Sequence, residues 1–290
     1  MSASIQLKLD GGLLHGPHSV TVRTLGRSMT SMQAAVDRAF LDIQFGQVFK
    51  HARLPIKYYA DADFVVGEMS EGSFVIDFLS ERGGPIVRRL IEAISNPYKE
   101  AVEGAGLEIY EIGRQIEGVK AQVLNEIVQP QPYEDFLNSP DPLATRAYGD
   151  RSITKNIDHM LTPVRKIEDA SLKLSLKASE QEGVQVFDFD SKVASEFSDV
   201  VTRRKLGGPV IFNGSLRALD RGHRKSNFKG KFTNFVNGKD LVLHIQSEED
   251  LVQLVPYLNE DELTIVACPI IEYDAFDPNA GDIQFLSIVQ

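Results

Sequence analysis

The sequence has no tryptophan and only one cysteine, Cys268, among its 290 residues. One cysteine excludes an intramolecular disulfide and any zinc site built from several cysteines. Cys268 lies within the apolar run 263–271, where we expect it to be a small buried residue and not a nucleophile.

Long apolar runs are also missing. No run approaches the ~20 residues that a membrane-spanning helix needs, and Met1–Lys8 lacks the pattern of a secretory signal. The chain contains no Walker motif and no Gly-x-Gly-x-x-Gly between a strand and a helix. We therefore expect a cytoplasmic protein that makes no membrane contact and uses no cofactor.

Catalytic and metal-binding patterns are sparse. Six histidines scattered over the chain give no Ser/His/Asp spacing, and the pair His15 and His18 beside Asp10 lacks the helical setting of a zinc site. The acidic turn at residues 274–282 lacks the spacing of a calcium loop. We therefore expect that the protein is not an enzyme and that it has no catalytic residue and no metal ligand.

Two pairs of aspartates keep a hydrolase hypothesis open. Asp61 and Asp63, like Asp188 and Asp190, are two residues apart, which places both carboxylates of a pair on one face of a strand. Such a pair would suffice for two-metal chemistry. No lysine follows at the spacing of a nuclease, so exposed acids at strand ends are the simpler interpretation.

Positive charge is concentrated in one window, residues 201–231. Nine basic residues and one acid, Asp220, give it a net charge of +8 in a chain of −10, which leaves −18 for the rest. Such clustering is typical of a protein with a local anionic partner. The basic residues are Arg203, Arg204, Lys205, Arg217, Arg221, Arg224, Lys225, Lys229 and Lys231.

The N-terminal half predicts an α+β domain over residues 1–142, with a small sheet and two long helices. Alternating apolar residues predict strands at 5–9, around 20–22 and in a hairpin over 64–79. A helix is expected over 28–41, and one of the two long helices begins at Pro85 and ends near Asn96.

The second long helix, expected over 107–128, has an apolar stripe with the spacing of a coiled coil. Two interpretations remain open for it: packing against the N-terminal sheet, or an oligomer interface that would make the protein a homo-oligomer. The interface residues would be Ile109, Ile112, Ile116, Val119 and Val123.

Four prolines within residues 129–142 predict a linker. We expect residues 143–206 to form a bridging segment, with a helix over 151–167, strands near 172–176 and 184–188, and a helix that Asp190 caps.

The sharpest pattern lies in residues 207–290. Strands are expected at 209–219, 227–235 and 239–245, followed by a helix over 247–258 and strands at 262–273 and 282–289. Asn237-Gly238 is a strong hairpin turn between the second and third strands. This β-β-β-α-β-β order resembles the OB-fold, which implies a five-stranded β-barrel.

The resemblance implies a binding face between the loops at 220–227 and 274–281, as OB-folds use for oligonucleotides and oligosaccharides. His223 joins the nine basic residues as a candidate nucleic-acid contact. Phe228 and Phe232 alternate with Lys229 and Lys231, and we expect the phenylalanines in the core and the lysines outside. The cluster would then contact phosphates, with little readout of bases.

The N-terminal strand, helix and hairpin, ending in the Gly72-Ser-Phe strand, resemble the start of uncharacterised bacterial proteins, some associated with antiviral defence. No residue roles follow from that resemblance. The leading hypothesis is a non-enzymatic protein that binds nucleic acid or another polyanion through the barrel. The alternative is a protein–protein adaptor or self-assembling structural protein whose basic patch meets an acidic surface. A metal-dependent hydrolase is the third.

Overall fold

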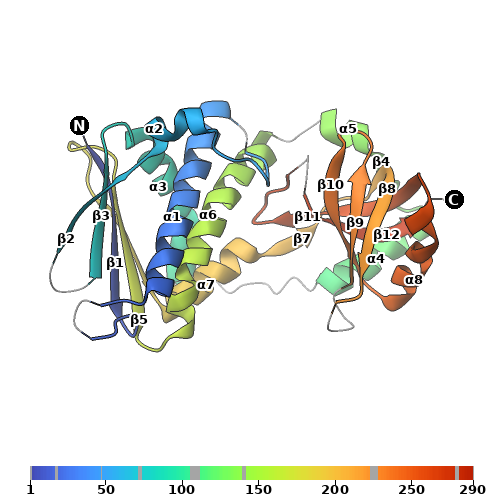
Figure 1. The fold of residues 1–290 in the computed structure, drawn as a ribbon. Helices are drawn as coiled ribbons and strands as arrows, with labels where there is room; N and C mark the ends of the chain where they lie inside the picture. Colours follow the sequence, from blue (N-terminus) through green and yellow to red (C-terminus); the bar gives the residue numbers. More distant parts are fainter. Residues whose placement is uncertain are drawn as a thin grey trace. The chain divides into compact units, whose positions relative to one another are not determined.

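The computed structural model describes residues 2–16, 19–46, 48–70, 74–104, 112–138, 142–222, 228–277 and 281–289. The chain is of the α+β class (Figure 1). It forms two compact units, each made of three stretches of chain. Unit 1 comprises Met1–Val48, Ala52–Leu107 and Tyr148–Thr202, and unit 2 comprises Phe49–His51, Glu108–Ala147 and Arg203–Gln290.

These boundaries differ from the expected ones. The segment expected to bridge the domains from residue 143 contributes its stretch 148–202 to unit 1, while residues 108–142, expected in the N-terminal domain, belong to unit 2. The reason is burial: apolar side chains of 148–202 complete the core of unit 1, and those of the helices α4, Ile112–Leu124, and α5, Tyr133–Asn138, complete the core of unit 2.

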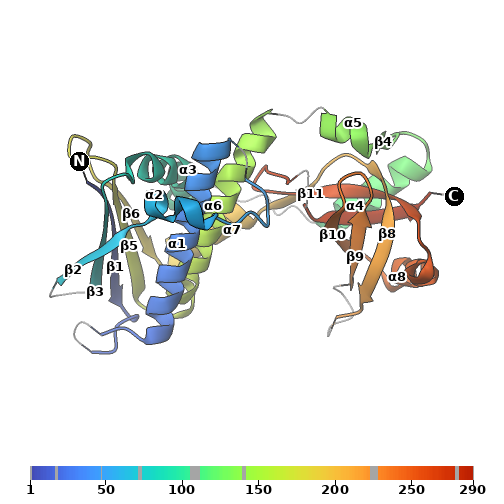
Figure 2. The same ribbon diagram turned by 45° about the horizontal axis from the view of Figure 1, so that its top comes forward.

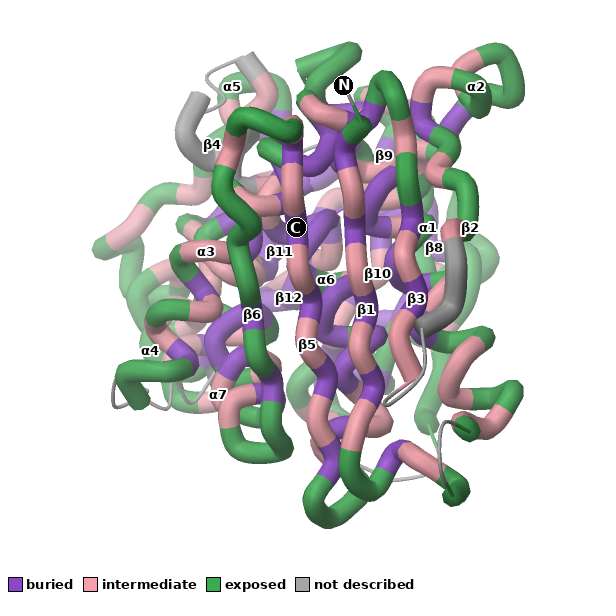
Figure 3. Tube along the Cα trace, turned by 90° about the vertical axis from the view of Figure 1, so that its left-hand side faces the viewer, coloured by how far each residue is buried: buried purple, intermediate pink, exposed green. Residues whose placement is uncertain are grey.

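Unit 1 is built on an antiparallel five-stranded sheet with the order β2-β3-β1-β5-β6. Burial alternates along β1 and β5, as the tube in Figure 3 shows, because successive side chains point to opposite faces. The expected hairpin over 64–79 is confirmed. The strands are β1 Ala3–Gly11, β2 Val65–Ser70, β3 Phe74–Ser80, β5 Ala170–Lys177 and β6 Gln185–Asp190.

Helices cover one face of this sheet (Figure 1 and Figure 2), the face that carries its buried apolar side chains. They are α1 Val22–Phe45, α3 Gly84–Glu103, α6 Pro142–Lys166 and α7 Ser191–Thr202, with the short α2 Tyr59–Ala62 preceded by the 3-10 turn Ile56–Tyr58. Asp190 caps α7 as expected, since its carboxylate accepts a hydrogen bond from the Val193 amide at 2.7 Å.

Two sequence expectations about these helices are wrong. Residues 20–22 do not form the expected strand. Instead, α1 begins at Val22, and Thr21 caps it, because the Thr21 hydroxyl accepts a hydrogen bond from the Thr24 amide at 3.1 Å. The helix that starts at Pro85 does not end at Asn96, because α3 continues through a buried Pro97 to Glu103. Packing of the apolar helix face outweighs the backbone hydrogen bond that proline cannot donate.

Unit 2 contains a closed five-stranded barrel, as the sequence predicted. Its strands run in the order β8-β9-β10-β12-β11, and β11 pairs back with β8. Only the β10–β12 pairing within this barrel is parallel. The order is consistent with an OB-like barrel. The strands are β8 Val210–Asp220, β9 Phe228–Asn234, β10 Lys239–Ile245, β11 Leu263–Glu272 and β12 Ile283–Ile288.

The expected helix between the third and fourth barrel strands is present as α8, Glu248–Leu254, extended by a 3-10 turn over Val255–Asn259. The Ser247 hydroxyl caps it by accepting from the Asp250 amide at 3.1 Å. At the β9–β10 turn, Gly238 has φ +66°, a conformation that glycine adopts without strain.

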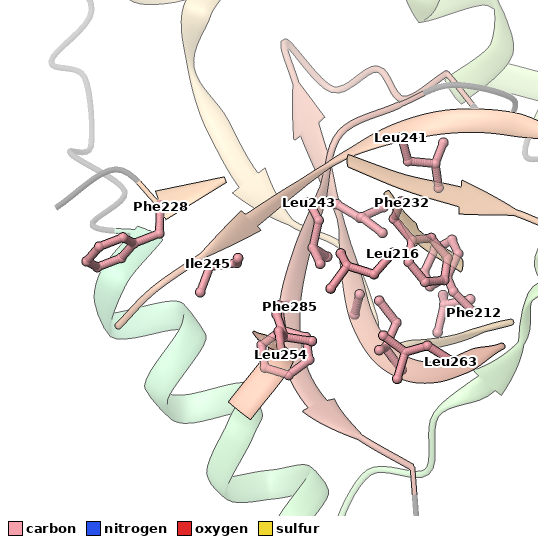
Figure 4. Packing of buried hydrophobic residues seen from close by; sticks show 14 of the residues in the cluster. Phe212, Leu216, Phe228, Phe232, Leu241, Leu243, Ile245, Leu254, Leu263 and Phe285 are labelled. Atoms are coloured by element: carbon pink, nitrogen blue, oxygen red, sulfur yellow. The ribbon is translucent and has the colours of Figure 1, made fainter. Parts of the chain in front are cut away.

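The barrel interior is filled by large apolar side chains (Figure 4). Phe212, Phe232 and Phe285 are fully buried there. Gly214 on β8 permits this packing, because a Cβ atom at that position would lie 2.1 Å from the Thr233 carbonyl oxygen and 2.7 Å from the Phe232 ring.

The proline-rich segment is not a free linker. β4, Gln131–Pro132, pairs with β8 at the edge of the barrel sheet, and α5, Tyr133–Asn138, follows it. Tyr133 is 3% exposed and packs on Phe212, with ring centroids 4.9 Å apart. Burial raises the pKa of Tyr133 to about 12. One buried aromatic residue therefore joins this segment to unit 2.

No helix within the described ranges is long and apolar enough to cross a membrane. Cys268 is fully buried on β11, as expected, and burial raises the pKa of its thiol to about 12. A thiol in that environment is inert as a nucleophile at neutral pH.

Candidate nucleic-acid interface

The basic window is divided between two places on unit 2. Its first part forms β7, Arg204–Leu206, which pairs with the end of β11 around Ile270–Glu272. Its second part forms β8 and β9, and β8 pairs with the opposite end of β11, around Leu263–Ala267. The strands therefore separate basic residues that are close in the sequence.

The β7 residues are paired with acids of unit 2. The Arg204 guanidinium lies 2.5 Å from a Glu272 carboxylate oxygen, and the Lys205 ammonium forms an ion pair with Asp274. Arg203 is half-buried, and its backbone carbonyl accepts from the Tyr273 amide at 2.9 Å. This end of the window holds the chain segment after β11 in place and has little free positive charge.

The second part presents positive charge on the outer face of the barrel. Phe228 and Phe232 of β9 are 4% and 0% exposed, so both point inward, whereas Lys229 and Lys231 are exposed. The expectation of core phenylalanines and outer lysines is confirmed. We call the exposed basic residues Arg217, Arg221, Lys229 and Lys231 the β8–β9 patch.

A β-bulge sets the position of Arg217. The register of β8 against β9 shifts between Leu216 and Ala218, which leaves Arg217 as the extra residue. Its Nε donates to the Thr233 hydroxyl at 3.3 Å, and that hydroxyl donates to Asp240 at 2.7 Å. Bulges commonly redirect a side chain near a functional surface.

Two acids partly neutralise the β8–β9 patch. The Lys231 ammonium lies 2.8 Å from Asp240, and the Arg221 guanidinium lies 4.0 Å from Glu248. The hydrogen bond from Lys231 is the main cause that lowers the pKa of Asp240. All four side chains are largely solvated, so these pairs are weak and can exchange for contacts with another anion.

Lys229 has a different environment. It lies opposite Asp220 on β8 and His244 on β10 in the register, and its ammonium has no ion-pair partner among the described residues. His244 instead contacts Asp282, with Nε2 3.3 Å from Oδ2. Lys229 is therefore the cation on this face that is best placed to meet an external anion.

Next to this face, an ionic cluster holds Asp282, the residue that precedes β12, in a fixed position. Asp282 accepts hydrogen bonds from His244 and from the Lys50 ammonium, and the Lys50 amide donates to Asp277 at 2.7 Å. Burial raises the pKa of Asp282, but these hydrogen bonds and charges lower it by more, so its pKa lies well below its ordinary value. No sequence pattern predicted this cluster, because Lys50 is far from its partners along the chain.

Several predicted contacts lie outside the described residues, namely His223, Arg224 and Lys225 of the loop that joins β8 to β9. Among the aromatic residues considered for base stacking, Phe212, Phe228 and Phe232 are buried, and Phe235 is 50% exposed. The described face can therefore supply phosphate contacts and a single aromatic surface.

The predicted oligomer stripe lies on α4, Ile112–Leu124. Ile116 is 2% exposed and packs with Val266, Cys268 and Leu286 on the outside of β11 and β12, while Val119 and Val123 lie against the same cluster. The packing surface is thus the barrel and not the N-terminal sheet. Ile109 lies outside the described residues, as does the side chain of Ile112.

The described members of the two aspartate pairs contact other side chains or cap a helix. Asp61 lies in α2 and not on a strand, and it accepts a hydrogen bond from Arg82 at 2.6 Å. Asp188 pairs with Lys173 at 3.0 Å, while Asp190 caps α7. Across the described ranges, no group of three or more histidine, cysteine or acidic side chains is arranged to hold a metal ion.

No family model, curated protein or solved structure matches this chain. The case for a function therefore depends on the geometry of the barrel face.

Proposed function

We propose that this protein is a non-enzymatic binding protein that holds single-stranded nucleic acid on the β8–β9 patch. The observation that carries the proposal is the strict division of β9, with phenylalanines inside the barrel and lysines outside. In OB-like barrels this outer face, between the first and last loops, is the one that binds oligonucleotides.

The geometry supports recognition of the phosphate backbone. Arg217 and Lys229 are exposed cations on adjacent strands. Lys229 lies opposite Asp220, so the two cations are offset by three residues, about 10 Å, along the strand direction. Cations spread along the face in this way can contact successive phosphates of an extended strand, and such contacts position a nucleic acid without reading its sequence. Phe235, exposed at the end of β9, offers one surface on which a base can stack.

The test is binding of a fluorescently labelled oligothymidylate, measured by anisotropy over a range of salt concentrations. The double variant Arg217→Gln, Lys229→Gln should bind about tenfold more weakly, and the slope of log affinity against log salt should flatten by about 1.4, from ~0.7 per lost contact. The matched control Lys99→Gln, Lys192→Gln removes the same charge from exposed positions in unit 1 and should bind like the wild type.

Both outcomes are informative if the thermal melts of the variants match that of the wild type. Equal affinities for the double variant and its control would refute the proposal, since the patch would then make no phosphate contact. In that case, the remaining interpretation of the patch is a docking surface for an acidic protein. Tighter binding of polyglutamate than of oligothymidylate would favour that interpretation directly.

A further inference from the structure

Unit 1 contains a pocket of about 520 Å³ between α1 and the strands β1, β2 and β3. Small-molecule sites in proteins are mostly of about 300–1,000 Å³, apolar, with a few polar groups at fixed positions. The pocket belongs to a different unit from the β8–β9 patch, so what it binds is independent of the proposed function.

The walls of the pocket are mainly apolar and come from separate elements. Two are thioether side chains and two are aromatic rings, which together favour a flat aromatic occupant through sulfur–aromatic and ring–ring contacts. The apolar side chains that matter most are Met29, Met32, Val36, Phe64, Val66 and Phe78.

One wall is fixed by a glycine. A Cβ atom on Gly83 would lie 2.4 Å from the Phe64 ring, so the ring lies directly against the backbone at that position. Gly83 has an ordinary φ of −71°, so close approach and not conformation requires glycine here. The ring therefore has a defined place in the pocket wall.

The polar edge of the pocket comes from one face of α1. Thr30, Gln33 and Asp37 are three and four residues apart, which places their side chains together. Gln33 Nε2 donates to Asp37 Oδ1 at 2.8 Å, and Oδ2 of Asp37 accepts no hydrogen bond within the described part of the chain. Among the described residues that line the pocket, Asp37 is the only charged one.

Burial raises the pKa of Asp37 and outweighs the hydrogen bond from Gln33 and the charge of Arg38, which lower it, and the charge of Asp63 adds a smaller increase. A half-buried carboxylate of this kind is stabilised when a cation binds beside it.

We propose that this pocket binds a small aromatic amine, with the ring between the thioether and phenylalanine side chains and the ammonium group on Asp37. The aromatic body accounts for the apolar walls, and the amine accounts for the single carboxylate with a free oxygen.

Three probes that share a phenylethyl group and differ in their polar end test this assignment by isothermal titration calorimetry on the full chain: 2-phenylethylamine, 2-phenylethanol and 3-phenylpropionate. The wild type should bind the amine about three- to fivefold more tightly than the alcohol, the range expected for one partly solvated ion pair, and the acid most weakly. Asp37→Asn should abolish the preference for the amine and leave the affinity for the alcohol unchanged.

A matched pair of variants on β2 tests the location. Val66 lines the pocket and is 45% exposed, so the bulkier ring of Val66→Trp should obstruct the pocket and strongly weaken binding of the amine and the alcohol without unfolding the chain. Val65 is 71% exposed and does not line the pocket, so Val65→Trp should bind both like the wild type. Absence of saturable binding to the wild type would overturn the proposal, as would unchanged binding to Val66→Trp or a retained amine preference in Asp37→Asn.

Discussion

Asp282 joins three segments of unit 2 through one carboxylate. It contacts His244 on β10 and Lys50 in the segment Phe49–His51, and it immediately precedes β12. Its pKa in the folded protein is well below its ordinary value, although burial alone would raise it. A carboxyl group with a lowered folded pKa stabilises the fold above its unfolded pKa of ~3.9, and this contribution is lost as the pH falls through the folded pKa.

Acid denaturation should expose this contribution. At pH 7, Asp282→Asn should reduce the free energy of unfolding of unit 2 by about 1–3 kcal/mol, because a hydrogen-bonded charge is lost. The difference from the wild type should shrink steadily below pH ~4, because the carboxyl group of the unfolded chain then binds a proton while the folded carboxylate stays ionised. Urea unfolding at pH 7, 4 and 3, followed by circular dichroism, measures both values. Asp261→Asn, an exposed control in unit 2, should have little effect. A difference that is independent of pH would contradict the role of the charge.

The sequence patterns predicted which side chains point into the barrel better than they predicted which residues form ion pairs. The alternation along β9 was enough to place Phe228 inside and Lys229 outside, because side chains of a strand alternate with a period of two. The acids that meet Arg204 and Lys231 were not predicted, since Glu272 and Asp240 lie outside the basic window and reach it through strand pairing. A count of local charge therefore overstated the free positive charge.

Among the elements, α4 shows what an amphipathic pattern determines. Its apolar stripe showed that one face is buried, but a stripe alone does not identify the surface that covers it. In the structure, Ile116 lies on β11 and β12, whereas the sequence left a choice between the N-terminal sheet and a second chain. An oligomer formed through Ile116, Val119 and Val123 would require α4 to leave the barrel.

The variant Ile116→Glu separates these alternatives. If α4 packs on its own barrel, an unpaired charge at a position 2% exposed should destabilise unit 2 by about 3–5 kcal/mol and lower its melting temperature. The control Ala121→Glu adds the same charge to an exposed position of α4 and should leave the melting temperature unchanged. If the stripe joined two chains instead, sedimentation would show Ile116→Glu as a folded, stable monomer derived from a larger wild-type species.

The barrel strands were the most predictable elements, because strong turn signals such as Asn237-Gly238 separate runs of alternating residues. The proline-rich segment was the least predictable. Prolines are common in linkers, but Pro132 lies on the edge strand β4, where a missing amide donor is tolerated, and Tyr133 beside it enters the barrel core. The sequence alone did not predict that this tyrosine is buried in the barrel core.

At the scale of the whole molecule, each unit is assembled from three separate stretches of chain. No local signal in the sequence marks residues 49–51 as part of unit 2, since their place depends on contacts of Lys50 with Asp277 and Asp282. The charge of the molecule is equally uneven. A net charge of −10 repels a polyanion at long range, but solvent ions screen that repulsion beyond ~10 Å at 0.1 M salt.

Local charge on the barrel face, and not net charge, should therefore decide the affinity for nucleic acid. Asp240→Asn and Asp261→Asn each change the net charge by one unit, but only Asp240 contacts Lys231, at 2.8 Å. Asp240→Asn should free that lysine for a phosphate, tighten binding of oligothymidylate about three- to tenfold and steepen the salt dependence by ~0.7. Asp261→Asn should change affinity less than about twofold, since no ion pair within the described residues joins Asp261 to the patch. Anisotropy titrations at two salt concentrations measure both effects. Equal tightening by the two variants would mean that the overall charge governs binding and that the β8–β9 patch is not the site.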